Sequence, residues 1–184
     1  MYCGSNKTAL QSQKQIAEAM MDLIREKPFT QITVSELCKT AGISRQTFYS
    51  LFTSRENVMV FALQTSDCDL PEISGSRRAE PESALRRLCR GYSEYMLRNR
   101  SLIKLLVDNG IDYLLYDSFF EVLDCCDCFL PKVDPCLRHY AASFYAGGIA
   151  CVARSYAREG CTSTAEGLEE LLLALLSGRL FLEE

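Results

Sequence analysis

The chain has 184 residues, 48% hydrophobic and 24% charged, so it can bury a core and is not a disordered sequence. No apolar run approaches the ~20 residues of a membrane span and the first residues lack the apolar core of a secretory signal, so we expect a cytoplasmic protein without a membrane partner. The net charge of −4 disfavours a nucleic-acid partner, but residues 1–66 hold seven Lys or Arg and five Asp or Glu, a net +2, and the remainder carries −6.

The chain begins with a helical pattern. Apolar residues at helical spacing, among them Ile16, Met20 and Leu23, predict a first helix that ends before Pro28. Residues 33–36 then form a capping-box sequence, in which the Thr33 hydroxyl and the Glu36 carboxylate are each expected to bind a backbone amide. A second helix is therefore predicted to begin there.

The next residues predict a tight turn and two further helices. Gly42 supplies the left-handed backbone of the turn, and Ser44 is a suitable N-cap for a third helix. That helix places Phe48 and Phe52 on one face and leaves its polar residues on the others, and Ser54 caps the helix that follows. Two short helices around a glycine turn, the second with a polar outer side, predict a helix-turn-helix whose second helix enters the DNA major groove.

Residues 14–63, and above all the segment ITVSELCKTAGISRQTFYSLFTSRENV, resemble the DNA-binding domain of the TetR family of transcriptional regulators. The family pattern is I-T-V, a helix, A-G-V-S, T-hydrophobic-Y-x-x-F, and a small residue with K-E. The resemblance implies an all-α fold, with an N-terminal helix-turn-helix, three-helix DNA-binding domain and a larger C-terminal helical domain that binds an effector and dimerises. It does not name the ligand, because the C-terminal residues of the family diverge widely.

The resemblance also assigns DNA contacts within this segment. Thr33 and Tyr49 match phosphate-contacting residues, and residues 45–47 fall where base edges or the nearby backbone are contacted. Arg55 stands where the family usually has a lysine that anchors the fourth helix to phosphate, and its guanidinium fork suits that role. Leu51 replaces a His or Tyr and removes one expected backbone contact. The predicted DNA-binding residues are Thr33, Ser44, Arg45, Gln46, Thr47, Tyr49, Ser50 and Arg55.

An ordinary helical hairpin with solvated polar residues is the alternative for this segment. The capping box, the turn glycine, the T-F-Y-x-x-F spacing and the next cap coincide in the right order, which favours the DNA-binding interpretation.

Composition predicts a domain boundary after the helix-turn-helix. Residues 65–79 mix Pro, Gly, Ser and charge, and Pro81 suits the first turn of the next helix. We therefore predict a DNA-binding domain over residues 1–64, a linker over 65–80 and a ligand-binding and dimerisation domain over 81–184. Within the last, helical patterns cover 82–100, 101–110, 111–130, 134–160 and 162–181.

The last two predicted helices have the features of a dimer interface. Small residues allow a close helix contact in the first of them, and leucines form an apolar stripe on the second, which is apolar on most sides. The resemblance implies that these helices build a four-helix dimer interface, and a monomeric core is the alternative. The predicted interface residues are Gly147, Gly148, Cys151, Leu168, Leu171, Leu172 and Leu175.

Aromatic and sulfur-bearing residues on the middle helices predict a pocket for a small-molecule effector, whose identity the sequence leaves open. The same residue types also fill ordinary helical cores. The candidates are Tyr92, Tyr95, Met96, Tyr113, Tyr116, Phe120, Phe144 and Tyr145.

The chain holds ten cysteines, which we expect to be reduced thiols because no export signal is present. Cys125, Cys128, Cys136 and His139 lie close enough in sequence to suggest a soft-metal or redox site. However, C-C-x-C inside a continuing helix lacks the turns of structural zinc sites, so no metal is predicted there. With one histidine and no glycine-rich phosphate loop, neither an enzyme nor a cofactor is expected.

These observations support three functional hypotheses. The first is a ligand-responsive regulator, acting as a repressor, that binds a palindromic double-stranded DNA operator as a homodimer. The second is a protein-interaction co-regulator of the same fold that does not bind an operator. The third is a thiol- or metal-responsive sensor.

Overall fold

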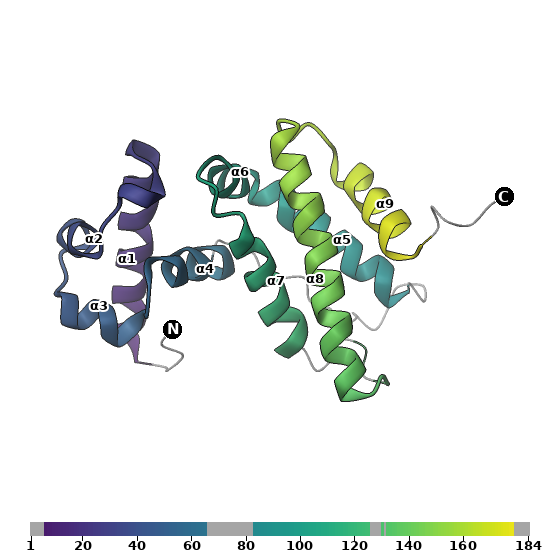
Figure 1. Ribbon diagram of the computed structural model, residues 1–184, viewed down its shortest axis with the longest axis horizontal. Helices are drawn as coiled ribbons and strands as arrows, with labels where there is room; N and C mark the ends of the chain where they lie inside the picture. Colours follow the sequence, from purple (N-terminus) through teal and green to yellow (C-terminus); the bar gives the residue numbers. More distant parts are fainter. Residues whose placement is uncertain (1–5, 66–82, 126–129, 131, 179–184) are drawn as a thin grey trace. The chain divides into compact units, whose positions relative to one another are not determined.

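The computed structural model describes residues 6–65, 83–125, 130 and 132–178, and all regular structure within them is helical (Figure 1). The chain divides into two compact units, Met1–Thr65 and Ser66–Glu184. No described helix is long and apolar enough to cross a membrane. The predicted linker, residues 65–80, lies outside the described residues except for Thr65, which ends a helix.

Residues 6–65 of the first unit form four α-helices and one 3-10 turn: α1 (Lys7–Glu26), η1 (Phe29–Gln31), α2 (Val34–Ala41), α3 (Arg45–Leu51) and α4 (Arg55–Thr65). The Asn6 side chain caps α1 by accepting from the Thr8 amide, and α1 ends just before Pro28, as predicted. The apolar face of α1 packs on α2 and α4. Its predicted core residues Ile16, Met20 and Leu23 are buried, as are Phe48 and Phe52.

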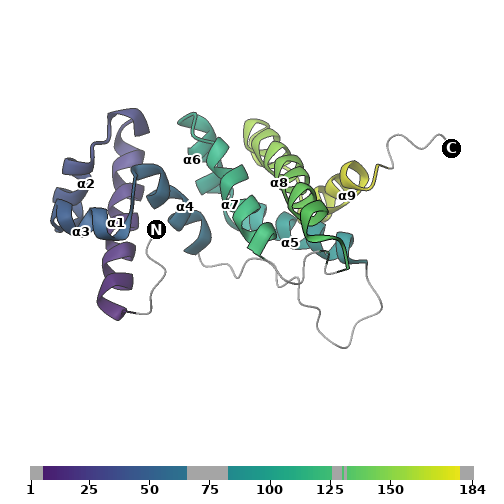
Figure 2. The same cartoon turned by 60° about the horizontal axis from the view of Figure 1, so that its bottom comes forward.

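The described part of the second unit holds five helices: α5 (Ala84–Arg98), α6 (Arg100–Asp108), α7 (Tyr113–Cys125), α8 (Pro135–Arg158) and α9 (Ala165–Leu176). They correspond to the five predicted helical patterns, although Pro81 and residues 126–129 lie outside the described residues. The long helix α8 runs beside α7 and α6, whereas α9 packs mainly along α5 (Figures 1 and 2). Fully buried Tyr92 and Tyr95 of α5 meet the ring of Phe119 of α7 edge-on, with centroids 5.0 and 5.6 Å away.

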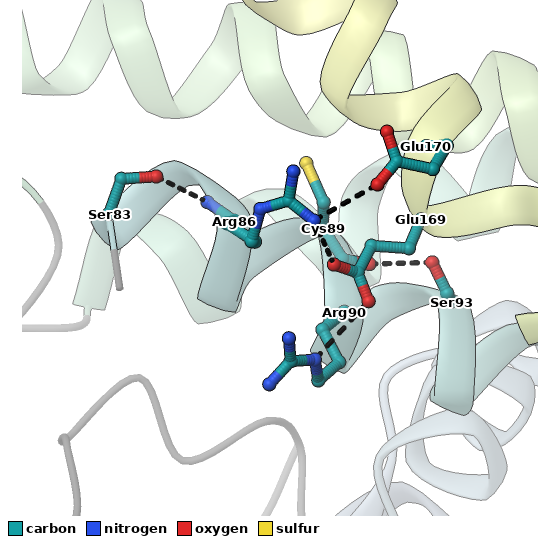
Figure 3. A network of polar contacts seen from close by, with 7 residues as sticks. All are labelled: Ser83, Arg86, Cys89, Arg90, Ser93, Glu169 and Glu170. Carbon is teal, nitrogen blue, oxygen red and sulfur yellow. Dashed lines mark hydrogen bonds and ion pairs between the residues drawn. The ribbon is translucent and has the colours of Figure 1, made fainter. Parts of the chain in front are cut away.

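A polar network fastens α9 to α5 at the edge of this core (Figure 3). The buried carboxylate of Glu169 accepts from Arg86 Nη1 at 3.1 Å and from Arg90 Nε at 3.2 Å, while Glu170 accepts from Arg86 at 3.0 Å. Cys89 lies on α5 between the two arginines, and burial raises the pKa of its thiol to about 11. This thiol is therefore protonated at neutral pH and acts as an apolar filler.

Candidate nucleic-acid interface

The start of α2 is fixed by Thr33 and by the end of α1. The Thr33 hydroxyl accepts from the Glu36 amide at 3.2 Å, so the predicted N-cap is confirmed. The reciprocal half of the capping box is wrong, because the Glu36 carboxylate pairs with the Lys27 ammonium. That hydrogen bond lowers the pKa of Glu36, and a cation is a stronger partner for a carboxylate than a neutral amide.

The turn between α2 and α3 has the predicted geometry. Gly42 adopts φ +67°, a left-handed conformation that costs glycine little, and the Ile43 amide closes α2 by donating to the Cys38 carbonyl at 3.0 Å. Ser44 then caps α3, because its hydroxyl accepts from the Thr47 amide at 3.0 Å. These local bonds fix the angle at which α3 leaves α2.

Helix α3 has an apolar inner side and a polar outer side. Phe48 and Leu51 are buried, whereas Arg45, Gln46 and Tyr49 are exposed. Arg45 forms no ion pair with any described residue, so its guanidinium is available to an external acceptor. The buried position of Leu51 gives this departure from the family pattern a role in the core.

The Tyr49 side chain is exposed but still packs against a neighbouring ring. Its side chain is 53% exposed, and its ring meets the edge of Phe48 at a centroid distance of 5.3 Å. The contact with Phe48 therefore holds the Tyr49 ring, and the phenol hydroxyl is presented at the surface.

The three hydroxyl residues predicted on this surface also make bonds within the helix. Ser44 and Thr47 join their hydroxyls at 2.9 Å, and the Ser50 hydroxyl donates to the Thr47 carbonyl at 2.7 Å. Each hydroxyl retains capacity for a further partner, so DNA contacts by Ser44, Thr47 and Ser50 stay predictions.

Arg55 occupies a different environment from the rest of the predicted set. Its Nη1 donates to the Phe29 carbonyl at 3.0 Å and to the Ile32 carbonyl, and its guanidinium carbon lies 4.8 Å from the centre of the Phe29 ring. Glu56 faces the other terminal nitrogen at 3.8 Å. The side chain is therefore engaged within the unit, which sequence reasoning from a phosphate-anchoring lysine did not anticipate.

The eight predicted pocket residues do not share one environment. Tyr92, Tyr95 and Met96 are fully buried, whereas Tyr113 and Phe144 are at least half exposed. The remaining three are Tyr116, Phe120 and Tyr145, and each contacts another ring. Tyr116 stacks on Phe120 with centroids 5.8 Å apart and bonds Ser143 at 2.8 Å, while Tyr145 meets Phe144 edge-on. The eight residues therefore lie in separate core and surface groups, and an effector pocket among them stays a prediction.

A half-open apolar groove of about 440 Å³ lies instead between α8 and α9. It is lined by six of the seven predicted interface residues, Gly148, Cys151, Leu168, Leu171, Leu172 and Leu175, and by Phe144. The leucine stripe divides: Leu168 and Leu172 are buried in the core, whereas Leu171 and Leu175 are 46% and 41% exposed. Leu168 and Leu172 therefore pack within the chain, and Leu171 and Leu175 stay predicted interface residues.

The predicted glycines also separate. A Cβ atom on Gly148 would lie 3.0 Å from Leu176, so its small size already serves packing between α8 and α9 of one chain. A Cβ atom on Gly147 would meet nothing within 4 Å, and that position stays a predicted interface residue.

The candidate thiol and metal residues lie at the facing ends of α7 and α8. Cys125 and Cys136 are exposed, and His139 Nδ1 lies 2.9 Å from the Asp124 carboxylate. Cys128 lies outside the described residues. Among those described, no three His, Cys, Asp or Glu side chains form a group that could hold a metal ion.

Comparison with known proteins identifies the amino-terminal unit. The sequence profile of the bacterial regulatory proteins of the tetR family matches residues 16–60, which include α2, the turn and α3. The dhaKLM operon transcriptional activator DhaS of Lactococcus lactis is 36% identical over 64 residues, covering 35% of this chain and 34% of DhaS. The transcriptional regulator EthR of Mycolicibacterium smegmatis is 38% identical over 69 residues, covering 35% of this chain and 32% of EthR. The amino-terminal unit therefore carries a tetR-family domain.

Solved structures extend the similarity to the second unit. The structure of DhaS matches with a TM-score of 0.52 at 20% identity, covering 91% of this chain and 95% of that one. A TetR-like regulator from Rhodococcus sp. RHA1 matches with a TM-score of 0.51 at 18% identity, covering 94% and 97%. At these identities the match shows a shared fold. The sequence matches span about a third of the length of the curated relatives.

Proposed function

We propose that this protein is a transcriptional regulator that binds double-stranded operator DNA as a homodimer. The observation that carries the proposal is the polar outer side of α3, where Arg45, Gln46 and Tyr49 are exposed on a helix held by two capped ends. A helix presented in this way fits the major groove, with its first residues at base edges and flanking groups on phosphate.

Each side chain suits a distinct part of the duplex. Arg45 can donate two hydrogen bonds to a guanine edge, and Gln46 can exchange two with adenine. Thr33 and Tyr49 supply hydroxyl donors for phosphate, and exposed Lys39 adds positive charge in the last turn of α2. Three of the seven cations in the described part of this unit face a carboxylate, and Lys39 and Arg45 are among the four that do not.

The second unit supplies a surface suited to pairing two copies. Leu171 and Leu175 of α9 are exposed beside the α8–α9 groove, and Phe144 is 66% exposed on α8. Large apolar side chains that cluster on a surface mark an interaction site. A two-fold dimer would place two α3 helices on two half-sites of a palindromic operator.

The proposal includes response to a small molecule. In its simplest form the DNA-bound dimer acts in the cytoplasm as a repressor. An effector bound by the second unit then favours a dimer whose α3 helices no longer fit the half-site spacing.

A salt titration of DNA binding tests the central claim. We would measure the affinity for a duplex selected by the protein from a random-sequence pool over a range of salt concentrations. The logarithm of the affinity should fall linearly with the logarithm of the salt concentration, by about 0.9 for each neutralised phosphate. Absence of binding at low salt would remove the operator claim and favour a co-regulator that acts through protein contacts.

A further inference from the structure

Arg55 joins parts of the amino-terminal unit that lie far apart in sequence. It is the first residue of α4, yet its guanidinium donates to the carbonyl groups of Phe29 and Ile32, 26 and 23 residues earlier. Those carbonyls belong to the short segment that contains η1 and leads directly into Thr33.

We infer that Arg55 is a positioning residue that sets the place of Thr33, rather than a phosphate anchor. The inference rests on the proposed DNA binding, because Thr33 is a predicted phosphate contact. Ile32 is the residue before Thr33, so a bond to its carbonyl fixes the peptide unit that joins the two. Arg55 also follows the end of α3 by only a few residues. Its side chain therefore connects the end of α3 to the start of α2.

The local environment makes these bonds important to the segment. Phe29 is 3% exposed and Ile32 is fully buried, so little water is available to replace the donor if the guanidinium is removed. The planar guanidinium also lies over the Phe29 ring, a contact that a lysine ammonium reproduces poorly. Arg55→Lys therefore keeps the positive charge but loses the planar group that lies over the Phe29 ring.

Amide hydrogen exchange in the DNA-free protein provides the first test. The Gln31 amide donates to the Pro28 carbonyl, the Ile32 amide to the Phe29 carbonyl and the Glu36 amide to the Thr33 hydroxyl. In Arg55→Lys these three amides should exchange about tenfold faster or more, since the opening of the segment loses a charge-assisted bond. Arg25→Lys is the matched control, because among the described residues exposed Arg25 pairs only with Asp22 on its own helix. Unchanged exchange in Arg55→Lys would overturn the inference.

DNA binding provides the second test. With the selected duplex, Arg55→Lys should weaken binding about tenfold at unchanged salt slope, because no phosphate charge contact is lost. Combined with Thr33→Ala, the two losses should be less than additive, since both act through one contact.

Two results separate the possible failures. If Arg55→Lys binds like the wild type and Arg55→Met reduces the salt slope by about one phosphate, Arg55 is a phosphate anchor and the inference is wrong. If the wild-type protein binds no duplex, the proposed function fails instead. The exchange rates of the Gln31, Ile32 and Glu36 amides then still decide whether Arg55 holds this segment.

Discussion

Tyr49 and Arg45 project from the same short helix, but we expect them to meet different parts of a DNA duplex. A phenol hydroxyl bound to phosphate carries no base information, so Tyr49→Phe should weaken binding to all sequences alike. A guanidinium at a base edge discriminates, so Arg45→Ala should relax the preference at one operator position, at a cost of about 1–3 kcal/mol. Binding of each variant to the selected operator and to its single-position variants measures both effects.

Gln15→Ala is a suitable control for these substitutions, because Gln15 is exposed on α1 outside the helix-turn-helix. Its affinity should match that of the wild type on every duplex. A uniform loss in Arg45→Ala, like that in Tyr49→Phe, would show that Arg45 contacts the backbone rather than a base.

The caps of the helix-turn-helix were predictable because their partners are local. Thr33, Ser44 and Ser54 each accept from an amide three residues on, a spacing that the sequence displays directly. The partners of Glu36 and Arg55 were not predictable in this way. Glu36 pairs with Lys27 across a chain turn, and Arg55 reaches carbonyl groups that carry no residue-type signal.

At the scale of helices, the packing of α9 on α5 depends on one carboxylate. Glu169 is buried between Arg86 and Arg90, so Glu169→Gln leaves both guanidinium groups without their shared anion. Both arginines are partly exposed, which limits the loss in unfolding free energy to about 2 kcal/mol. Chemical denaturation of the full chain measures this difference.

Glu170→Gln is the matched control, since it makes the same change at the neighbouring position. Glu170 is exposed, and its ion pair within the described part of the chain is with Arg86, so the loss should be under about 1 kcal/mol. Equal losses in the two variants would contradict a special role for the buried carboxylate.

Sequence periodicity predicted the helices of the second unit but not how they share their faces. Leu168, Leu171, Leu172 and Leu175 are all equally apolar. Periodicity alone therefore could not say which of these leucines face the core. The placement of α9 along α5 decides it, and that placement depends on pairs such as Arg86 and Glu169, which are 83 residues apart. The aromatic residues of the predicted pocket were similarly ambiguous, because Tyr92 and Tyr95 fill a core with the residue types that line ligand sites.

At the scale of the whole molecule, the proposed function requires two copies. Leu171→Glu and Leu175→Glu each place a charge on the exposed half of the α9 stripe. In a folded monomer the carboxylate is solvated, but in a dimer it would be buried without a partner, so both variants should be monomers. Binding to a duplex with two half-sites should then fall by about a hundredfold or more, because the advantage of linking two α3 helices is lost.

Two control variants test whether the effect is specific to the exposed leucines of α9. Leu10→Glu introduces the same charge at an exposed leucine of α1, and it should leave the dimer intact. Leu172→Glu buries the charge within the chain itself, because Leu172 is fully buried, and it should destabilise the second unit rather than only separate the copies. Sedimentation of the four variants beside the duplex titration decides the matter. If Leu171→Glu and Leu175→Glu both remain dimers with unaltered DNA binding, the exposed leucines of α9 do not form the interface, and the two copies must pair through another surface.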